Sequence, residues 1–566
     1  MSRECDWCQK CVSLAVFGLL VAATSCQSAR SQPSGSSESS QANFTGVLTW
    51  KGSNSRNGVF ASETTLTTSN VSPGQFGLIG NFQGDGLIVA QPLYVANVNM
   101  GPSGVHNIII LATENDSVYA VDADNLSGGS LWERHYLDPA NGIVPLPDNF
   151  GGRTTLGGEV GITGTPILDP STGVLYFVTT YLDNGVAEQW LRSIDVRTGQ
   201  DSGPGGVQIQ ASVPGTGKGS VNGQIPFDPS LQNQRSGLAE INGSILVGWA
   251  SFSDWGVYHG WLMAFDASTL QLQAVFNPTT QAQAVDPADG PADHGGGGGI
   301  WQGGAAPAVD SAGNIYVEAA DGSFNADEQG NNYGDTLLKL RLNGGQFQLQ
   351  DWFTPSNQAC LDVADLELGS GGLMLLPAGS ANFGVTIDKE GRLFLVNTDT
   401  LGHFNASADQ IPQEFMVGED SCTSGVSGVA EGTTWNRLYG DTTYWNGYLY
   451  AQASNLAMKQ YQFQNGSFNP TPIAESPSAS GARGANIVVS ANGNQNGIVW
   501  AYEKTTSGQA ILHAYDATSV SHELWNSNMN SSDQLGTGIA FDPPVVAQGR
   551  LIVTSNVTAS VYGLLH

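Results

Sequence analysis

The sequence has 566 residues, including 73 glycines, and only 12% of its residues are charged while 40% are hydrophobic. This composition is typical of a turn-rich β protein and excludes a helical bundle, which needs far more Ala, Glu, Lys and Arg. Twenty Lys and Arg against 50 Asp and Glu give a formal net charge of −30, which would repel phosphates, so nucleic acid is excluded as a partner. The acidic surface is explained by the solubility of an exported protein, with cation binding as the alternative.

The first element in chain order is an apolar run from Val12 to Ala23, behind Arg3 and Lys10. It has the length of the central region of a signal peptide and is too short to span a bilayer comfortably. The run is followed by Thr, Ser and Cys26, which resembles a bacterial lipoprotein signal. We therefore expect residues 1–25 to be removed and Cys26 to carry a lipid, in the periplasm or at the cell surface. Ordinary cleavage followed by secretion is the alternative.

Residues 26–46 are rich in Ser, Gln, Pro and Gly and predict a flexible tether, because such a segment cannot bury a core. The folded domain is expected to span residues 47–566. The mature chain keeps three cysteines, Cys26, Cys360 and Cys422. If Cys26 is acylated, Cys360 and Cys422 are a candidate disulfide in an oxidising compartment, with two buried free thiols as the alternative.

The folded domain consists of repeats that each end in an alternating strand followed by a turn. The residue after that strand is, in order, Asp122, Asp195, Asp266, Arg341, Asn397, Gln462, Asp516 and Gly563. Asp or Asn before a Thr, Ser or Gly turn favours chain reversal, because its short side chain can bond its own backbone. Each repeat holds about four strands and no long amphipathic helix. The sequence therefore predicts an all-β fold, an eight-bladed β-propeller of four-stranded antiparallel blades.

The eighth repeat ends at the C-terminus one strand short. We expect the segment from Leu48 to Phe60, near the start of the domain, to supply this strand. Closing the ring in this way removes the exposed sheet edges that favour aggregation.

The strand endings carry a family resemblance. The segments Tyr119-Ala120-Val121-Asp122 with Trp132, and His513-Ala514-Tyr515-Asp516-Ala517-Thr518 with Trp525, resemble the repeat of propellers of the pyrroloquinoline quinone (PQQ) type. Trp50-Lys51-Gly52 is similar to the first strand of that family. The resemblance covers residues 47–566 and implies the fold of the quinoprotein-alcohol-dehydrogenase-like group, although one propeller fold carries many functions.

The dehydrogenases of this group hold PQQ and Ca²⁺ on the propeller axis, with the cofactor stacked on a Trp, and the alcohol-oxidising branch covers it with a disulfide between adjacent cysteines. This sequence has no adjacent cysteine pair and no CxxCH haem motif, which argues against that branch. The group also includes a non-catalytic lipoprotein of the outer-membrane barrel-assembly machine, which follows a signal and a short tether in a similar way.

Several residues are candidates for an axial site. Glu159 starts a glycine-rich inner strand and is the candidate Ca²⁺ ligand, the alternative being a hydrogen-bonded loop residue. His294 precedes the glycine run 295–299 and is the candidate catalytic base, or else a solvated residue. Trp301 and Gln302 follow that run and are candidate cofactor contacts; an aromatic between blades is the alternative for Trp301.

Arginines stand out because basic residues are few. Arg483, between small residues at an inner strand, is the candidate cation for the carboxylates of a bound cofactor, ahead of Arg153 and Arg437. A structural ion pair is the alternative use. The acidic segment 321–335 resembles a Ca²⁺ loop only loosely, and a solvated loop is the alternative.

We therefore expect an exported, lipid-anchored propeller that acts as a binding or scaffold protein. Its partner would be a protein or glycan at the loops between blades or in the axial funnel, and the chain would be monomeric. The alternative is a PQQ- and Ca²⁺-dependent dehydrogenase of an alcohol or sugar, so the sequence leaves enzymatic activity undecided.

Overall fold

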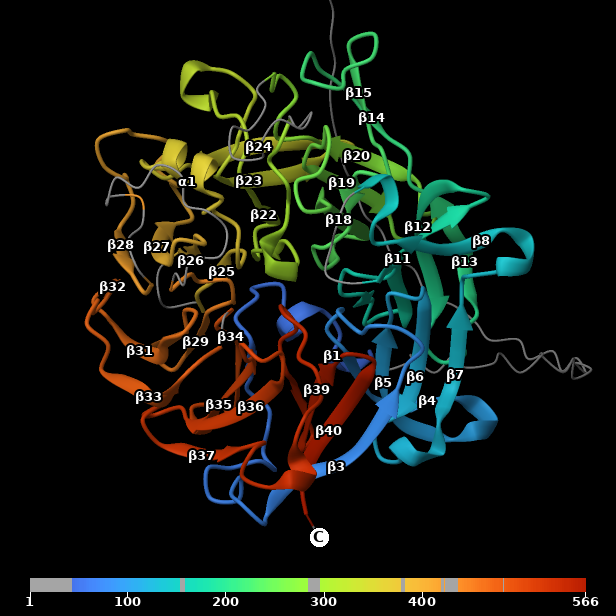
Figure 1. Ribbon diagram of the computed structural model, residues 1–566, viewed down its shortest axis with the longest axis vertical. Coiled ribbons are helices and arrows are strands. Elements are labelled where there is room, and N and C mark those ends of the chain that lie inside the picture. Colours follow the sequence, from blue (N-terminus) through green and yellow to red (C-terminus); the bar gives the residue numbers. More distant parts are fainter. Residues whose placement is uncertain are drawn as a thin grey trace, which may run out of the picture. The chain divides into compact units, whose positions relative to one another are not determined.

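The computed structural model describes residues 43–152, 158–283, 296–377, 382–418, 422, 436–481 and 483–565. Within these ranges the strands form eight sheets arranged radially around one axis, and one separate two-stranded hairpin (Figure 1). The eight-bladed propeller predicted from the repeats is therefore confirmed.

The blades follow one another in chain order, and each runs from an inner strand near the axis to an outer one. Blade 1 contains β1 (Thr45–Val47), β4 (Leu93–Asn99), β5 (Val105–Ala112), β6 (Ser117–Asp122) and β7 (Ser130–His135). Blade 2 contains β10 (Ile167–Leu168), β11 (Val174–Asp183), β12 (Val186–Asp195) and β13 (Asp201–Gln208), extended by β8 (Ile143–Pro147) and β9 (Glu159–Val160). Blade 3 contains β16 (Gln232–Asn233), β17 (Ala239–Ile241), β18 (Ser244–Ser251), β19 (Trp261–Asp266) and β20 (Leu272–Phe276). Blade 4 contains β21 (Ala308–Val309), β22 (Asn314–Ala319), β23 (Thr336–Asn343) and β24 (Gln346–Phe353).

The second half of the ring continues in the same way. Blade 5 contains β25 (Met374–Leu375), β26 (Phe383–Ile387), β27 (Arg392–Asn397) and β28 (Gln413–Met416). Blade 6 contains β29 (Thr443–Trp445), β30 (Tyr448–Ala451), β31 (Ala457–Gln464), β32 (Ser467–Phe468) and β33 (Ala474–Ala479). Blade 7 contains β34 (Ala485–Asn492), β35 (Gln495–Lys504), β36 (Ala510–Asp516) and β37 (Glu523–Asn526), joined by β2 (Val59–Phe60). Blade 8 contains β38 (Val545–Ala547), β39 (Arg550–Ser555), β40 (Thr558–Leu564) and β3 (Phe76–Gln83).

The remaining regular elements are short. The separate hairpin consists of β14 (Ser212–Pro214) and β15 (Gln224–Pro226), and one α-helix, α1 (Gln358–Ala364), is found among the described residues. The 3-10 turns are η1 (Trp50–Gly52), η2 (Gly101–Ser103), η3 (Leu126–Gly128), η4 (Pro139–Asn141), η5 (Phe150–Gly152), η6 (Gln302–Gly304), η7 (Ala326–Glu328) and η8 (Ser531–Asp533).

The repeated aspartates close the strand reversals by the local bonds that the sequence predicts. The Oδ1 atom of Asp195 accepts a hydrogen bond from the N–H of Arg197 at 2.7 Å. The same atom of Asp516 accepts from the N–H of Thr518 at 2.8 Å. Each bond satisfies a backbone donor that the turn leaves without a strand partner, which explains why the repeats can be found in the sequence.

Blade 8 is completed by a different strand from the one expected. β3, residues Phe76–Gln83, pairs antiparallel with β40 along its whole length, so the expectation for Leu48–Phe60 is wrong. The physical reason lies in the side-chain pattern. β3 buries Phe76 completely and then alternates half-buried and exposed residues, as an outer strand should. The segment Lys51-Gly52-Ser53-Asn54-Ser55 has no such alternation.

The segment 44–65, which we call the axial segment, instead fills one end of the propeller axis (Figure 1). Its backbone and side chains make hydrogen bonds to all eight blades. These bonds are the β1–β4 pairing (blade 1), Leu48 O with Leu168 N (blade 2), Asn54 Nδ2 with Glu240 O (blade 3), Asn54 O with Val309 N (blade 4), Ser55 O with Leu375 N (blade 5), Lys51 Nζ with Thr442 O (blade 6), Gly58 O with Val489 N (blade 7) and Glu63 Oε2 with Gly549 N (blade 8). The partners on blades 2, 4 and 5 lie at the C-terminal ends of the inner strands β10, β21 and β25. The axis is therefore closed by protein at this end.

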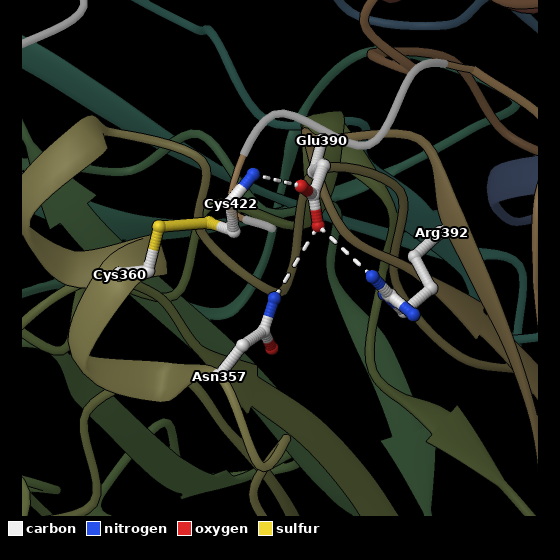
Figure 2. The surroundings of a disulfide bond; sticks show 5 residues. All are labelled: Asn357, Cys360, Glu390, Arg392 and Cys422. Carbon is white, nitrogen blue, oxygen red and sulfur yellow. Dashed lines mark hydrogen bonds and ion pairs between the residues drawn. A yellow bond between two sulfur atoms is a disulfide. The ribbon is translucent and has the colours of Figure 1, made fainter. Parts of the chain in front are cut away.

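A disulfide joins Cys360, on α1, to Cys422, with 5.9 Å between the two Cα atoms. The buried carboxylate of Glu390 lies beside it (Figure 2). Glu390 accepts a hydrogen bond from the N–H of Cys422 at 2.6 Å and one from Asn357 at 3.3 Å, and it pairs with Arg392 at 3.6 Å. The bond closes a separation of 62 residues and so constrains the unfolded chain between blades 4 and 6.

Candidate ligand-binding site on the propeller axis

The end of the axis opposite the axial segment holds an open cavity with an empty volume of about 720 Å³. Five blades contribute lining residues to it. Most of these residues lie at or before the start of the inner strand of their blade, and the others lie at the end of the second strand or in the hairpin that follows it. The lining residues are Leu87, Val89 and Glu114 from blade 1, Glu159, Val160 and Thr163 from blade 2, Asn233 from blade 3, Arg483 and Lys504 from blade 7, and Gly538, Ile539 and Ala540 from blade 8. A funnel-shaped opening on the axis is the usual ligand position in a concave fold of this kind.

Glu114 is the deepest charged group of the cavity. Its Oε2 atom accepts hydrogen bonds from the N–H of Gly161 at 2.7 Å and from the hydroxyl of Thr163 at 3.0 Å. Burial raises the pKa of Glu114 to about 7, although these bonds and Arg235 act in the opposite direction. Its Oε1 atom has no hydrogen-bond partner among the described residues and is left for a ligand or water.

Asn233 of blade 3 lines the same cavity and is also incompletely bonded. Its side chain is 8% exposed, and its Oδ1 atom is buried with no hydrogen-bond partner among the described residues. A buried acceptor without a donor costs free energy.

The basic side of the cavity comes from blade 7. Arg483 is exposed, and its guanidinium lies 5.4 Å from the ring of Tyr439 and 5.9 Å from that of Phe541. These two contacts orient the guanidinium by cation–π attraction and leave its N–H groups available. Lys504 follows on the neighbouring strand β35.

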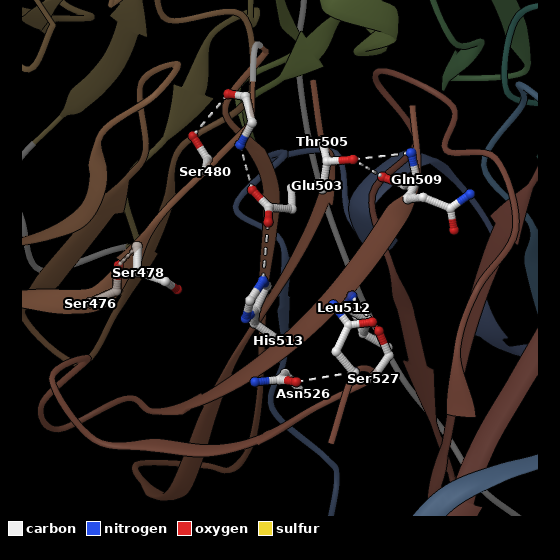
Figure 3. A network of polar contacts seen from close by, with 12 residues as sticks. Ser476, Ser478, Ser480, Glu503, Thr505, Gln509, Leu512, His513, Asn526 and Ser527 are labelled. Carbon is white, nitrogen blue, oxygen red and sulfur yellow. Dashed lines mark hydrogen bonds and ion pairs between the residues drawn. The ribbon is translucent and has the colours of Figure 1, made fainter. Parts of the chain in front are cut away.

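A buried ion pair of Glu503 with His513 stabilises the turn that carries Arg483 (Figure 3). Glu503 accepts a hydrogen bond from the N–H of Gly481 at 2.7 Å, and its other oxygen lies 3.3 Å from Nε2 of His513. The Nδ1 atom of His513 bonds Glu523 at 2.7 Å. Burial alone would lower the pKa of His513, but its hydrogen bonds to Glu503 and Glu523 raise it to about 9. His513 is therefore protonated at neutral pH and holds both glutamates in place.

Beneath the cavity, buried charges occupy the axis between the two ends. Arg235 is 4% exposed and lies within electrostatic range of Glu114, Asp542 and Asp441. Asp441 pairs with Lys51 of the axial segment at 3.7 Å. One carboxyl oxygen each of Asp441 and Asp542 is buried without a hydrogen-bond partner among the described residues. In this cluster the positive charges of Arg235 and Lys51 face the carboxyl groups of Glu114, Asp441 and Asp542.

Two of the residues predicted from the sequence meet at this site. Glu159 and Arg483 line the same cavity from blades 2 and 7. Trp301 is half-buried and does not belong to the cavity lining. Gln302 is buried with its amide already used, because Nε2 donates to Ala305 O at 2.9 Å and Oε1 accepts from Glu318 N at 3.0 Å.

Other predicted residues lie elsewhere. His294, Cys26 and Arg153 lie outside the described residues. Arg437 is buried, and its Nη1 atom lies 3.4 Å from the hydroxyl of Tyr439.

The sequence interpretation missed Glu114, Asn233, Arg235 and Lys504. Glu114 and Lys504 occupy similar positions in their blades: Lys504 ends the second strand, and Glu114 lies in the hairpin just after it. Aligning the repeats on that hairpin, rather than on the closing strand, would have brought both to notice. Arg235 and Asn233 carry no comparable signal, because their burial depends on the packing of other blades.

The acidic segment 321–335 is solvated in its middle, where Asp327 and Glu328 are exposed, but its two ends are buried. Asp321 is 5% exposed, and Asp335 is fully buried, with hydrogen bonds from Leu368 N and Gln358 Nε2, both at 3.2 Å. Burial raises the pKa of both carboxyl groups. The described residues contain no group of three His, Cys, Asp or Glu side chains that could hold a metal ion.

In the part of the chain that the structure describes, no helix is long and apolar enough to cross a membrane. No protein-family model matches the sequence, and no curated protein matches it either. Solved structures do share its fold. The quinohemoprotein alcohol dehydrogenase ADHIIG from Pseudomonas putida HK5 superposes with a TM-score of 0.53 at 14% identity, covering 92% of this chain and 80% of that one.

Two further structures are similar. The quinohemoprotein alcohol dehydrogenase from Comamonas testosteroni has a TM-score of 0.52 at 13% identity, covering 92% of this chain and 80% of that one. A europium-containing methanol dehydrogenase has a TM-score of 0.55 at 15% identity, covering 91% of this chain and 90% of that one. The chain is thus a PQQ-like propeller in fold, as the resemblance implied, and identities this low say nothing about its activity.

Proposed function

We propose that this protein is an exported binding protein whose small-molecule site is the axial cavity. The observation that supports this most strongly is the set of three charged side chains, Glu159, Arg483 and Lys504, that line the cavity without an ion pair to another described residue. A ligand that carries complementary charges can pair with these solvent-accessible side chains at one concave surface.

We also propose that a lipid on Cys26 anchors the protein to a membrane. The axial segment begins at Phe44, whose N–H donates to Pro170 O at 2.8 Å, just beyond the C-terminal end of β10. The cavity lies at the other ends of the inner strands. Replacing Cys26 by Ser should move the protein from the membrane fraction to the soluble one, and continued membrane association would contradict the lipid anchor.

The binding role is tested by thermal melting of the purified protein with pools of small polar compounds. A ligand of the cavity should raise Tm of the wild type but not of the Ala540→Trp variant, because Ala540 lines the cavity and a Trp side chain fills it. The variant keeps every charged group, and its own Tm without ligand is the control for folding. A compound that stabilises both proteins equally binds elsewhere and contradicts the assignment of the cavity.

The alternative is a dehydrogenase that holds PQQ and a metal ion, which the shared fold favours. Arg483 and Lys504 suit the carboxylates of PQQ. However, none of the residues lining the cavity is aromatic, and the described residues offer no set of three metal ligands. The residues in place therefore match the charge of this cofactor but not its flat ring system or its metal ion.

This alternative is tested by adding PQQ and Ca²⁺ to the purified protein and following dye reduction with alcohols or aldose sugars. Reduction that requires both additions would overturn the binding role in favour of the enzyme.

A protein or glycan partner at the loops between blades, and the monomeric state, remain proposals of the same kind. Light scattering of the purified protein would test the second of these.

A further inference from the structure

The geometry points to a specific ligand class for the axial cavity, a small zwitterion that carries an ammonium group at one end and a carboxylate at the other. This inference rests on the proposed binding function and goes beyond it by naming the chemistry of the ligand. It follows from how the cavity separates its charges. Both carboxyl groups come from blades 1 and 2, both cations come from blade 7, and blade 8 lies between the two groups.

The acidic end provides acceptors for an ammonium group. The Oε2 atom of Glu114 is held by Gly161 and Thr163, so the carboxyl group cannot turn away, and its Oε1 atom has no partner among the described residues. Glu159 stands at the exposed edge of the same side. An ammonium group has three donors and no acceptor, which suits the carboxylate oxygens of Glu114 and Glu159.

The basic end provides donors for a carboxylate. Arg483 presents its planar guanidinium, steadied by Tyr439 and Phe541, and a guanidinium can donate two parallel hydrogen bonds to one carboxylate. Lys504 adds a flexible point charge beside it. The turn that carries Arg483 is fixed by Glu503, so the position of the guanidinium is set by the fold before a ligand arrives.

Ligands of a single charge fit this arrangement less well. A dianion would be attracted by Arg483 and Lys504 but would bring negative charge towards Glu114 and Glu159. A dication would meet the opposite conflict. Only a molecule with charges of both signs neutralises both sides at once, and a net charge of zero also avoids the repulsion of the −30 background.

Isothermal titration calorimetry at low salt tests this, with ω-amino acids of increasing length from glycine to 5-aminovalerate as probes. One length should bind best, and butyrate and n-butylamine, which each carry one charge, should bind at least about tenfold more weakly than γ-aminobutyrate. Arg483→Gln and Glu159→Gln each should weaken the best probe by about tenfold or more. Glu114→Gln keeps an acceptor for Gly161 and Thr163 and should do the same. Arg134→Gln and Glu133→Gln, which change matched charges on the outer strand β7, should leave binding unchanged.

The outcomes separate this inference from the binding function itself. If butyrate binds as well as γ-aminobutyrate, or if none of the ω-amino acids binds at millimolar concentration, the zwitterion inference is wrong. The binding function still stands in that case when some other compound stabilises the wild type and not Ala540→Trp. If no compound distinguishes those two proteins, both the inference and the binding function fail.

Discussion

The two ends of the propeller axis use the same chemical group in opposite ways. At the closed end, Arg56 is 2% exposed and faces no carboxylate, yet its guanidinium donates to Pro307 O at 2.8 and 3.0 Å, to Thr49 Oγ1 at 2.9 Å, and to Trp50 O and Ser53 O at 3.2 and 3.0 Å. At the open end, Arg483 contacts aromatic rings, and no described side chain takes up its donors in an ion pair.

The difference shows how a structural charge is distinguished from one kept for a ligand. A buried cation is tolerated where every donor has a partner, because the hydrogen bonds offset the loss of water. A cation whose donors remain free at a concave surface gains its partner from outside. The following predictions test this contrast, starting with the largest effect.

Removing the residues up to Gly58, most of the axial segment, should abolish folding. A chain that begins at Val59 lacks the hydrogen bonds given above to blades 1 to 7 and leaves that end of the axis unfilled. We expect no cooperative unfolding transition by circular dichroism or calorimetry. A chain that begins at Asn43 is the control and should melt like the full-length protein. A cooperative transition of similar Tm in the shorter chain would show that the axial segment is dispensable.

Exchanging each arginine for Met should separate the two ends directly. Arg56→Met removes five hydrogen bonds and leaves buried carbonyl groups unpaired, so the free energy of unfolding should fall by about 3 kcal/mol or more. Arg483→Met is the matched control and should change it by less than about 0.5 kcal/mol. Urea denaturation of both variants measures this. Equal losses would remove the distinction between a structural and a ligand-directed arginine.

The fold could be predicted from the sequence because its signals are local. The aspartate turns, such as those at Asp195 and Asp516, depend on residues two positions apart. The closing strand could not be identified in this way, because β3 and its partner β40 are separated by almost the whole chain. The alternating side-chain pattern of Phe76–Gln83 is present in the sequence, but it does not indicate which strand is its partner.

The candidate site was predicted only in part for the same reason. Glu159 and Arg483 follow or precede glycines at inner strands, and that local feature placed both at the axis. Trp301 and Gln302 share the feature, but the side-chain amide of Gln302 is already hydrogen-bonded to Ala305 O and Glu318 N. Whether a polar group is bonded within the protein depends on contacts between blades, which the sequence does not reveal.

The stability that His513 contributes, through Glu503, to the turn of Arg483 should depend on pH. Because its folded pKa is raised to about 9, His513 contributes stability that is fully present below its ordinary pKa of about 6.5 and is lost as the pH rises through about 9. At pH 6 the wild type should exceed His513→Gln in free energy of unfolding by roughly 3 kcal/mol, and the difference should shrink above pH 9. Chemical denaturation from pH 6 to 10 measures this. A difference that does not change with pH would mean that His513 is not protonated in the folded protein.

A last pH-dependent effect is expected at Glu318, on strand β22 of blade 4. This carboxyl group is fully buried; its Oε1 atom accepts from the hydroxyl of Thr386, and its Oε2 atom has no hydrogen-bond partner among the described residues. Burial raises the pKa of Glu318 to about 8, so the ionised form is unfavourable in the folded protein. Native stability from this group therefore falls as the pH rises from its ordinary pKa of 4.5 towards 8.

Glu318→Gln removes this penalty while keeping an acceptor for Thr386. The variant should gain up to roughly 4 kcal/mol over the wild type at pH 8 and little at pH 5, because a protonated Glu and a Gln are alike in charge. Tm of both proteins at the two pH values measures the gain. Asp327→Asn, an exposed carboxylate on η7, is the control and should show no such dependence. A variant that is less stable than the wild type at pH 8 would show that the ionised Glu318 is stabilised by hydrogen bonds, as the buried Arg56 is at the closed end.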